Sequence, residues 1–265
     1  MDGSSTQPAR AVIELIDATI PSRRLPGVVA VDHVNWTVRE GDFWVIGGLH
    51  GSGKSDLLAA AAALAKPTRG THRLFGQEIV PTYGDERLAE RLRVALVFGE
   101  GGRLFNQLTV WENVALPLHY HQPPEASDVT PRVTALLEAT ALTEWSHALP
   151  SALSQDWRQR AALARALALR PEVLLLDNPL TALDPRQVRW WMAFLARLAA
   201  GHPLMNGRPM TIVAATDDLR PWQAPGRRFA LLDDTRLVLL EDGSSFDPQH
   251  TPAWRELLAA EPDIT

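Results

Sequence analysis

The sequence predicts an α/β fold with a mostly parallel sheet, and three features support that prediction. Short apolar runs with the length of strands alternate with longer Ala/Leu-rich runs that have the spacing of helices. A glycine-rich loop follows the run 43–46, and an aspartate ends the run 173–177. The 265 residues are 46% hydrophobic and 22% charged, which is ordinary for a folded globular protein. Ligands of such sheets bind beyond the carboxyl ends of the strands, so we expect the site there.

The first hundred residues are predicted to form strands around one long helix. The run 56–66 is rich in Ala and Leu and is stopped by Pro67, which predicts a helix. A charged stretch, 87–93, has helical spacing as well. The predicted strands in this part are 12–20, 28–38, 43–46, 70–76 and 94–98.

The pattern then becomes helical from residue 99 to about 154, which indicates an inserted helical subdomain. Within and after it we expect helices at 110–120, 131–143 and 156–169. Further strands are expected at 173–177, 210–216 and 229–232, with a closing helix at 254–260. The chain is thus predicted to be one domain, 1–265. Its core spans about 12–98 and 156–240, its helical subdomain about 99–155, and its C-terminal extension about 241–265.

The stretch with the clearest chemistry is Gly48–Ser55, which satisfies the phosphate-binding pattern G-x-x-x-x-G-K-[ST] between a strand and a helix. Its residues are Gly48, Leu49, His50, Gly51, Ser52, Gly53, Lys54 and Ser55. The glycines let backbone N–H groups turn around a phosphate, and the helix N-terminus adds a positive dipole end. Lys54 is predicted to reach the β- and γ-phosphates, and the Ser55 hydroxyl to hold Mg²⁺. The alternative is a Gly/Ser turn that matches by chance.

Asp177 is the second candidate for the site, because it ends a hydrophobic strand about 120 residues after Ser55. A carboxylate in that place holds Mg²⁺ opposite the Ser or Thr of the phosphate loop in many nucleotidases. The alternative is an aspartate that N-caps the next element. Together with the phosphate loop, the magnesium interpretation is favoured.

Charge and composition exclude several classes of function. A net charge of −5 gives no electrostatic reason to expect a nucleic-acid partner. Zero cysteines exclude disulfides and thiolate metal sites. The polar start, 1–7, has no apolar segment of a signal peptide, and no stretch approaches 18 apolar residues without charge. We therefore expect a cytoplasmic protein whose membrane role, if any, comes through partners.

With these pieces in place, the chain resembles the nucleotide-binding subunit of ATP-binding-cassette (ABC) transporters from about Val12 to Leu240. The family's motifs appear in its order: 48–55, 104–114, Leu153-Ser154 followed by 158–167, Leu176-Asp177, and 182–185. The sequence of residues 104–118 (LFNQLTVWENVALPL) is most similar to that of lipid-trafficking cassettes of the Mla/Mce kind.

The resemblance implies a P-loop NTPase (RecA-like) core with an antiparallel β subdomain and the inserted helical subdomain. It also implies ATP and Mg²⁺ as cofactors and a separate transmembrane permease as a partner, which would hold the chain at the inner face of the membrane. A second cassette, identical or different, is implied as well, and Ser154 would contact the ATP bound by that second cassette.

The sequence departs from the family at positions that serve the chemistry. The glutamine that the family has after the strand at 94–98 is Gly99 here, and the signature L-S-G-G-Q is Leu153–Trp157, without either glycine. The glutamate expected after the magnesium aspartate is Asn178, and the expected histidine is Asp217. The aromatic residue that stacks on adenine in the family is absent from the loop 21–27. Arg23 or Arg24 could replace it through a cation–π contact.

These departures predict weak hydrolysis. Asn178 can orient water but cannot accept a proton, and the loss of a general base typically costs about 10²–10⁴ in rate. Asp217 puts a negative charge where a donor to the γ-phosphate is expected. Glu100, in a Gly-rich turn, is the alternative carboxylate. The catalytic positions, Asn178 and Asp217, are therefore predicted to be degenerate.

Three functions remain in competition at this point. The leading one is an energising transporter subunit in which Mg-ATP binding closes a cassette dimer and drives a permease, with attenuated hydrolysis and a lipid as a candidate cargo. The second is a catalytically inactive, nucleotide-gated structural or regulatory subunit. The third, a soluble cassette that acts on DNA or the ribosome, is disfavoured by the acidic charge balance.

Overall fold

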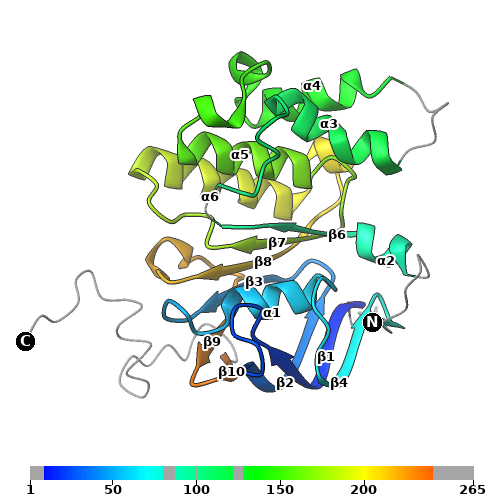
Figure 1. Cartoon of the computed structure of the whole chain (residues 1–265), viewed down its shortest axis with the longest axis vertical. Helices are drawn as coiled ribbons and strands as arrows, with labels where there is room; N and C mark the ends of the chain where they lie inside the picture. The colour runs from blue at the N-terminus through cyan, green and yellow to red at the C-terminus, as the bar shows by residue number, and fades with distance from the viewer. Residues whose placement is uncertain (1–8, 80–86, 100, 122–127, 241–265) are drawn as a thin grey trace, which may run out of the picture.

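The computed structural model describes residues 9–79, 87–99, 101–121 and 128–240, and within them two sheets organise the chain (Figure 1). A sheet of order β2-β1-β4-β5 is antiparallel, and a sheet of order β10-β9-β3-β8-β7-β6 is mostly parallel. The antiparallel sheet consists of β1 (Ala11–Pro21), β2 (Val29–Arg39), β4 (Arg69–Leu74) and β5 (Gln77–Glu78). The other consists of β3 (Phe43–Gly47), β6 (Val94–Val97), β7 (Val173–Asp177), β8 (Thr211–Thr216), β9 (Arg228–Asp233) and β10 (Arg236–Leu240).

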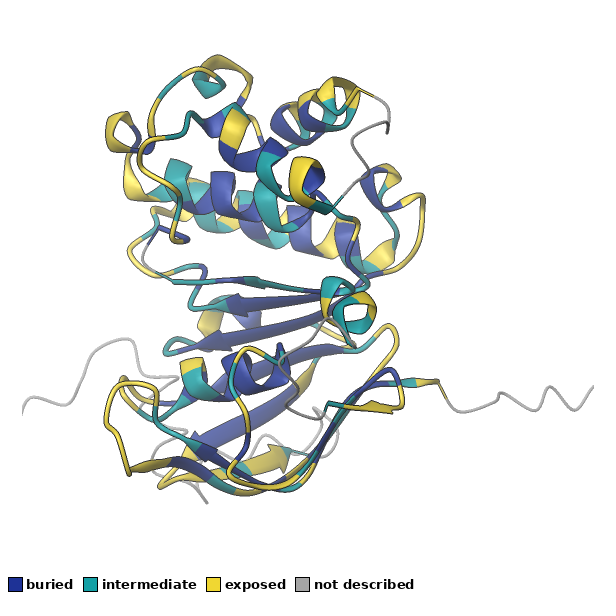
Figure 2. Cartoon of the chain, turned by 45° about the vertical axis from the view of Figure 1, so that its right-hand side comes forward, coloured by how far each residue is buried: buried dark blue, intermediate teal, exposed yellow. Residues whose placement is uncertain are grey.

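The central strands β3, β7 and β8 of the mostly parallel sheet are buried on both faces, which explains why they are almost entirely apolar. Side chains alternate between the two faces along each strand. In β3, Phe43 and Val45 pack into one apolar cluster, whereas Trp44 and Ile46 pack into the other. Figure 2 shows the central strands buried along their length. The carboxyl ends of β3, β7 and β8 meet at the same edge because the three strands run parallel in adjacent positions.

Helices cover the two faces of this sheet differently (Figure 1). Helix α1 (Lys54–Ala61) contacts β1 and β2 of the antiparallel sheet as well as β7 and β8, so it lies between the sheets. The opposite face carries α3 (Val110–His121), α4 (Thr130–Ala139), α5 (Gln155–Ala166) and α6 (Pro185–Ala200). The short helix α2 (Leu88–Leu92) precedes β6. This arrangement places the loop between β3 and α1 at the edge where the strands end.

Most predicted elements are present, but several helices end earlier than predicted, and helix α6 and strands β5 and β10 were not predicted. Helix α1 ends at Ala61 instead of residue 66, because Ala63 takes a left-handed conformation with φ of 56°. Helix α4 ends at Ala139 instead of residue 143, where the 3-10 turn Thr143–Trp145 begins. Helix α6 was not predicted, although Asp184 caps its first turn and Pro185 occupies its first position. The predicted helix 254–260 lies outside the described residues.

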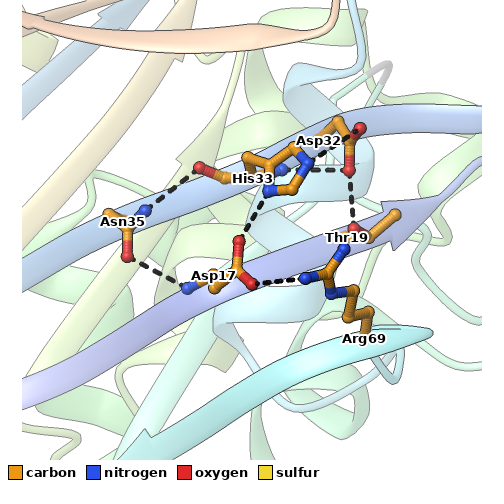
Figure 3. A network of polar contacts seen from close by, with 6 residues as sticks. All are labelled: Asp17, Thr19, Asp32, His33, Asn35 and Arg69. Carbon is orange, nitrogen blue, oxygen red and sulfur yellow. Dashed lines mark hydrogen bonds and ion pairs between the residues drawn. The ribbon is translucent and has the colours of Figure 1, made fainter.

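A polar network holds a kink that β1 and β2 share (Figure 3). Asp17 and His33 both have positive φ, 46° and 49°, where the register between the strands shifts. The His33 ring bonds the Asp17 carboxylate at 2.6 Å, and Arg69 from β4 bonds its other oxygen at 3.1 Å. The Thr19 hydroxyl donates to Asp32 at 2.6 Å beside them. These exposed contacts offset the strain of the two left-handed residues and belong to the scaffold.

Helix α5 is held at its C-terminal end by Arg132 of α4. The three guanidinium nitrogens donate to the carbonyl oxygens of Leu167 (2.6 Å), Ala168 (3.2 Å) and Leu204 (2.8 Å). The carbonyl groups that follow a helix end have no partner within the helix, and Arg132 supplies one. Burial lowers the pKa of Arg132 to about 10, and the nearby Arg170 charge adds to that shift.

Replacement of Arg132 by methionine is therefore expected to lower the free energy of unfolding by about 3 kcal/mol, because three carbonyl groups lose a charged side-chain donor. Chemical denaturation measures the change. The matched control is Arg189→Met on α6, an exposed arginine whose loss is expected to cost less than about 0.5 kcal/mol. Equal stabilities of the two variants would contradict this role for Arg132.

Candidate functional site

The loop Gly48–Gly53 connects β3 to α1 and turns tightly against neighbouring backbone. A Cβ atom at Gly48 would lie 2.6 Å from the Ser52 Oγ and 2.8 Å from the Leu232 carbonyl oxygen. Gly53 has φ of +99°, and a Cβ there would lie 2.9 Å from the Ala30 carbonyl oxygen. Side chains at either position would displace backbone, so glycine is required at both. The resulting loop sits at the N-terminus of α1, as a phosphate cradle requires.

Lys54 is buried under this loop. Its ammonium group donates to the carbonyl oxygens of Gly48 (2.5 Å) and Leu49 (2.8 Å), and it lies 3.4 Å from the Ser52 Oγ. Burial lowers the pKa of Lys54, while the charges of Asp217 and Asp177 oppose that shift. The structure thus places the predicted cation inside the loop, facing two carboxylates from the ends of β8 and β7.

Ser55 and Asp177 come together as the sequence predicts. Burial raises the pKa of Asp177, and a hydrogen bond with Ser55 together with the charge of Lys54 opposes the shift. A hydroxyl and a carboxylate are oxygen ligands of the kind that Mg²⁺ prefers. No cluster of three or more acidic, histidine or cysteine side chains able to hold a metal occurs in the described parts of the chain. Mg²⁺ at this pair would therefore take its remaining ligands from phosphate and water, as it does in other nucleotide sites.

Asn178 and Asp217 lie beside this pair and bond each other. The Asn178 Nδ2 donates to the Asp217 Oδ2 at 3.0 Å, and the Asp217 backbone N–H donates to the Asn178 Oδ1 at 3.3 Å. The neighbouring Asp218 is held elsewhere, because Arg220 bonds both of its carboxylate oxygens, at 2.8 and 2.7 Å. The two positions that the sequence identified separately thus form one unit.

Gly99 lies at the edge of the same site. A Cβ at Gly99 would lie 3.1 Å from the Asp177 carbonyl oxygen, so the segment after β6 runs against the end of β7. The buried side chain of Gln159 from α5 fixes this segment, accepting from the Gly101 N–H at 3.1 Å and donating to the Phe98 carbonyl at 3.2 Å. Sequence analysis missed Gln159. The available signal was a neutral polar residue on the apolar face of a helix.

Ser154 lies apart from this cluster. It is the exposed N-cap residue of α5, and its hydroxyl bonds the Asp156 carboxylate. Among the described residues, no hydrogen bond joins Ser154 to the phosphate loop. Its predicted contact with the ATP of a second cassette remains a prediction.

Two arginines add positive charge near the site. The charges of Arg23 and Arg103 both lower the pKa of Asp177, against the larger effect of burial. The Arg23 backbone N–H also donates to Asp56 in the first turn of α1 at 3.1 Å, which ties the loop 21–27 to the phosphate loop's helix. The predicted alternative carboxylate, Glu100, lies outside the described residues.

A model of the family described as "ABC transporter" matches residues 31–181, which is more than half of the chain. The chain belongs to the ABC transporter family. Its described architecture is the ATP-binding cassette fold, with an α/β core, an antiparallel sheet and a helical insertion as predicted. Cassettes of this family bind ATP, typically with Mg²⁺, so the loop 48–55 lies in an ATP-binding domain.

Solved cassettes support the same assignment. The chain superposes on the dimeric cassette MJ0796 bound to ADP and Pi with a TM-score of 0.74 and 30% identity, covering 85% of this chain and 96% of that one. It also superposes on cbiO1 from Clostridium perfringens, part of the complex cbiONQ, with a TM-score of 0.71. That superposition covers 87% of this chain and 88% of cbiO1. Because the two sequences are only 24% identical, the similarity to cbiO1 shows the fold alone.

Curated relatives of this cassette are named methionine import ATP-binding proteins, MetN. The protein from Lacticaseibacillus paracasei is 32% identical over 86% of this chain and 63% of its own length. That from Haemophilus ducreyi is 35% identical over 82% and 60%. The cassette thus spans less than two thirds of these relatives, and none of them carries a lipid-trafficking name, so the narrower resemblance to Mla/Mce cassettes finds no support here. No helix in the described ranges is both long and apolar enough to cross a membrane.

Proposed function

We propose that this cassette is the ATP-binding subunit of a membrane importer and that Mg-ATP binds at Gly48–Ser55 and Asp177. The observation that carries the proposal is the convergence of the glycine loop, the buried Lys54 and the Ser55–Asp177 pair at one sheet edge. Calorimetric titration of the full chain with Mg-ATP tests it. Binding at micromolar to low millimolar concentration supports the proposal, and no binding at millimolar Mg-ATP rejects it.

The proposed partners are a transmembrane permease and a second cassette. A hollow of about 520 Å³ lies between the segment 91–105, α3 and α5, on a face where a permease loop could dock. Phe105 and Tyr120 line this hollow with side chains that are 47% and 80% exposed. Large aromatic residues exposed at a hollow are typical of interface hot spots. Through such a permease the cassette would sit at the inner face of the membrane. Its net charge of −5 gives no electrostatic reason to expect a nucleic-acid partner.

A double replacement, Phe105→Ser with Tyr120→Ser, is expected to weaken permease binding about 100-fold, since truncation of two such side chains removes roughly 3 kcal/mol. Binding to the permease in nanodiscs measures this, and Mg-ATP affinity is expected to stay unchanged. The control is Val238→Ser on β10, which is 49% exposed and does not line the hollow. Equal losses in both variants would place the permease elsewhere.

We propose methionine or a chemically similar amino acid as the cargo, because the curated relatives described above are named methionine import ATP-binding proteins. The wording of 104–118 motivates the lipid alternative. The permease complex in proteoliposomes separates the two: ATP-dependent uptake of labelled methionine supports the first, and transfer of labelled phospholipid supports the second.

A second candidate function is a nucleotide-gated subunit without useful hydrolysis, as Gly99, Asn178 and Asp217 suggest. It predicts Mg-ATP binding and permease binding with ATP turnover no higher than that of a Lys54→Ala complex. Turnover that Lys54→Ala abolishes would exclude it.

A further inference from the structure

The two departures from the family at the hydrolytic site are bonded to each other, and this changes what they can do. Taken singly, Asn178 lacks a proton-accepting group, and Asp217 adds a negative charge. As a pair they contain one carboxylate and one neutral hydrogen-bonding group, joined at 3.0 Å. The family's glutamate and histidine also provide one carboxylate and one neutral hydrogen-bonding group, at the opposite positions.

The fold explains why the two side chains meet. Strands β7 and β8 are parallel neighbours, with Asp177 paired to Ala215, so the residues just beyond their ends lie side by side. The Asn178 N–H continues the ladder by donating to the Ala215 carbonyl at 2.9 Å. Asn178 has φ of 51°, a left-handed conformation that asparagine tolerates better than glutamate does. The backbone thus suits an amide at 178 and leaves the carboxylate to 217.

Within the pair, the hydrogen bonds distinguish the roles. Both polar atoms of the Asn178 amide are used, one as donor and one as acceptor. The Asp217 Oδ2 accepts from the amide, whereas the Oδ1 accepts no hydrogen bond from any of the described residues. The pair therefore presents one oriented carboxylate oxygen that is free to take a proton.

Charge places this carboxylate at the phosphate end of the site. The charge of Asp217 opposes the effect of burial on the pKa of Lys54, and it does so more strongly than the charge of Asp177. Lys54 is the cation that the loop directs to the terminal phosphates. Asp218, by contrast, is neutralised by Arg220.

We propose that Asp217 is the general base for ATP hydrolysis in this cassette and that Asn178 is the positioning residue that orients its carboxylate. The proposal rests on the proposed function, namely Mg-ATP binding at residues 48–55. In this step the Asp217 Oδ1 takes a proton from water as the water oxygen forms a bond to the γ-phosphorus. The bond between that phosphorus and the β,γ-bridging oxygen breaks, and ADP leaves with the electron pair. The proton then passes from Asp217 to the released phosphate or to solvent.

The test compares full-length wild type with Asp217→Asn, Asn178→Ala and the control Asp218→Asn, each alone and in the permease complex. Single-turnover hydrolysis and Mg-ATP affinity are measured on every sample. Asp217→Asn is expected to keep Mg-ATP affinity within about threefold and to lose about 10²-fold in hydrolysis, the lower end for a general base.

Asn178→Ala is expected to lower hydrolysis about tenfold while Mg-ATP affinity stays within about threefold, because the Asp217 carboxylate loses the amide that orients it. A merely structural role for Asn178 would lower Mg-ATP affinity and hydrolysis together. Asp218→Asn is expected to behave as wild type. The proposal is overturned if Asp217→Asn hydrolyses ATP as fast as wild type or faster, as relief of charge repulsion predicts, or if wild type binds Mg-ATP without any single-turnover hydrolysis. Failure of wild type to bind Mg-ATP would instead reject the proposed function itself.

Discussion

Replacement of Lys54 by alanine is expected to weaken Mg-ATP binding about 10³-fold and to abolish turnover. Lys54 is buried within the loop and places its charge among backbone carbonyl groups and two carboxylates. Truncation of one member of a buried, hydrogen-bonded charge pair costs roughly 2–5 kcal/mol of binding, and 4 kcal/mol corresponds to about 10³ in affinity. Calorimetric titration of the purified chain measures the change.

The chain provides a matched control in its other lysine. Lys66 is exposed beyond α1, and Lys66→Ala is expected to bind Mg-ATP as wild type does. Burial lowers the pKa of Lys54, so its charged form is disfavoured in the folded protein, and Lys54→Ala is not expected to unfold the ligand-free chain. A melting temperature near that of wild type would show that lost binding is not lost folding. Retained affinity in Lys54→Ala would reject the role of the loop.

Asp177→Asn is expected to lower Mg²⁺-dependent ATP affinity at least about 100-fold. Loss of residues that only support metal ligands typically costs about 10–100-fold, and Asp177 is proposed to bind the ion directly. The measurement is ATP titration with and without Mg²⁺. In wild type, Mg²⁺ is expected to raise the ATP affinity, and Asp177→Asn is expected to lose this increase. The control Asp56→Asn, in the first turn of α1, is expected to retain it. Equal dependence on Mg²⁺ in wild type and Asp177→Asn would contradict the assignment.

Asp177→Asn is also expected to stabilise the ligand-free protein, and the direction of this stability change follows from the pKa of Asp177. Burial raises the pKa of Asp177 above its ordinary value of 3.8 in the folded state. The folded protein therefore holds this proton more tightly than the unfolded chain, and stability is lost as pH rises through the folded pKa. Asp177→Asn removes that loss, so its higher melting temperature should be present at pH 7 and disappear below about pH 3.8. The Asp177 carboxylate thus lowers the folding stability of the ligand-free protein but provides a ligand for the metal.

Local patterns were sufficient to predict the loop and most of the strands. The phosphate loop, Asp177 and the buried strands follow from short-range spacing and from apolar runs, whereas the largely exposed strands β5 and β10 were missed. Helix α6 was missed because the Asp184-Pro185 start was interpreted only as part of a family motif. The Asn178–Asp217 pair and the contacts of Gln159 were out of reach, since each depends on residues that tertiary packing brings together. Comparison with the family one position at a time therefore could not show that Asn178 and Asp217 are bonded to each other.

Helix α1 lies wedged between two sheets, with Leu57, Leu58 and three alanines that follow them fully enclosed. A helix packed between two sheets cannot shift or rotate when a ligand binds at its first turn. The helix that carries the cradle is thus fixed before the ligand binds, and little ordering entropy is lost in that helix on association. Any conformational change that follows ligand binding must therefore occur in the helical layer on the other face of the parallel sheet. In that layer, α3 and α5 line the hollow that also contains Phe105 and Tyr120.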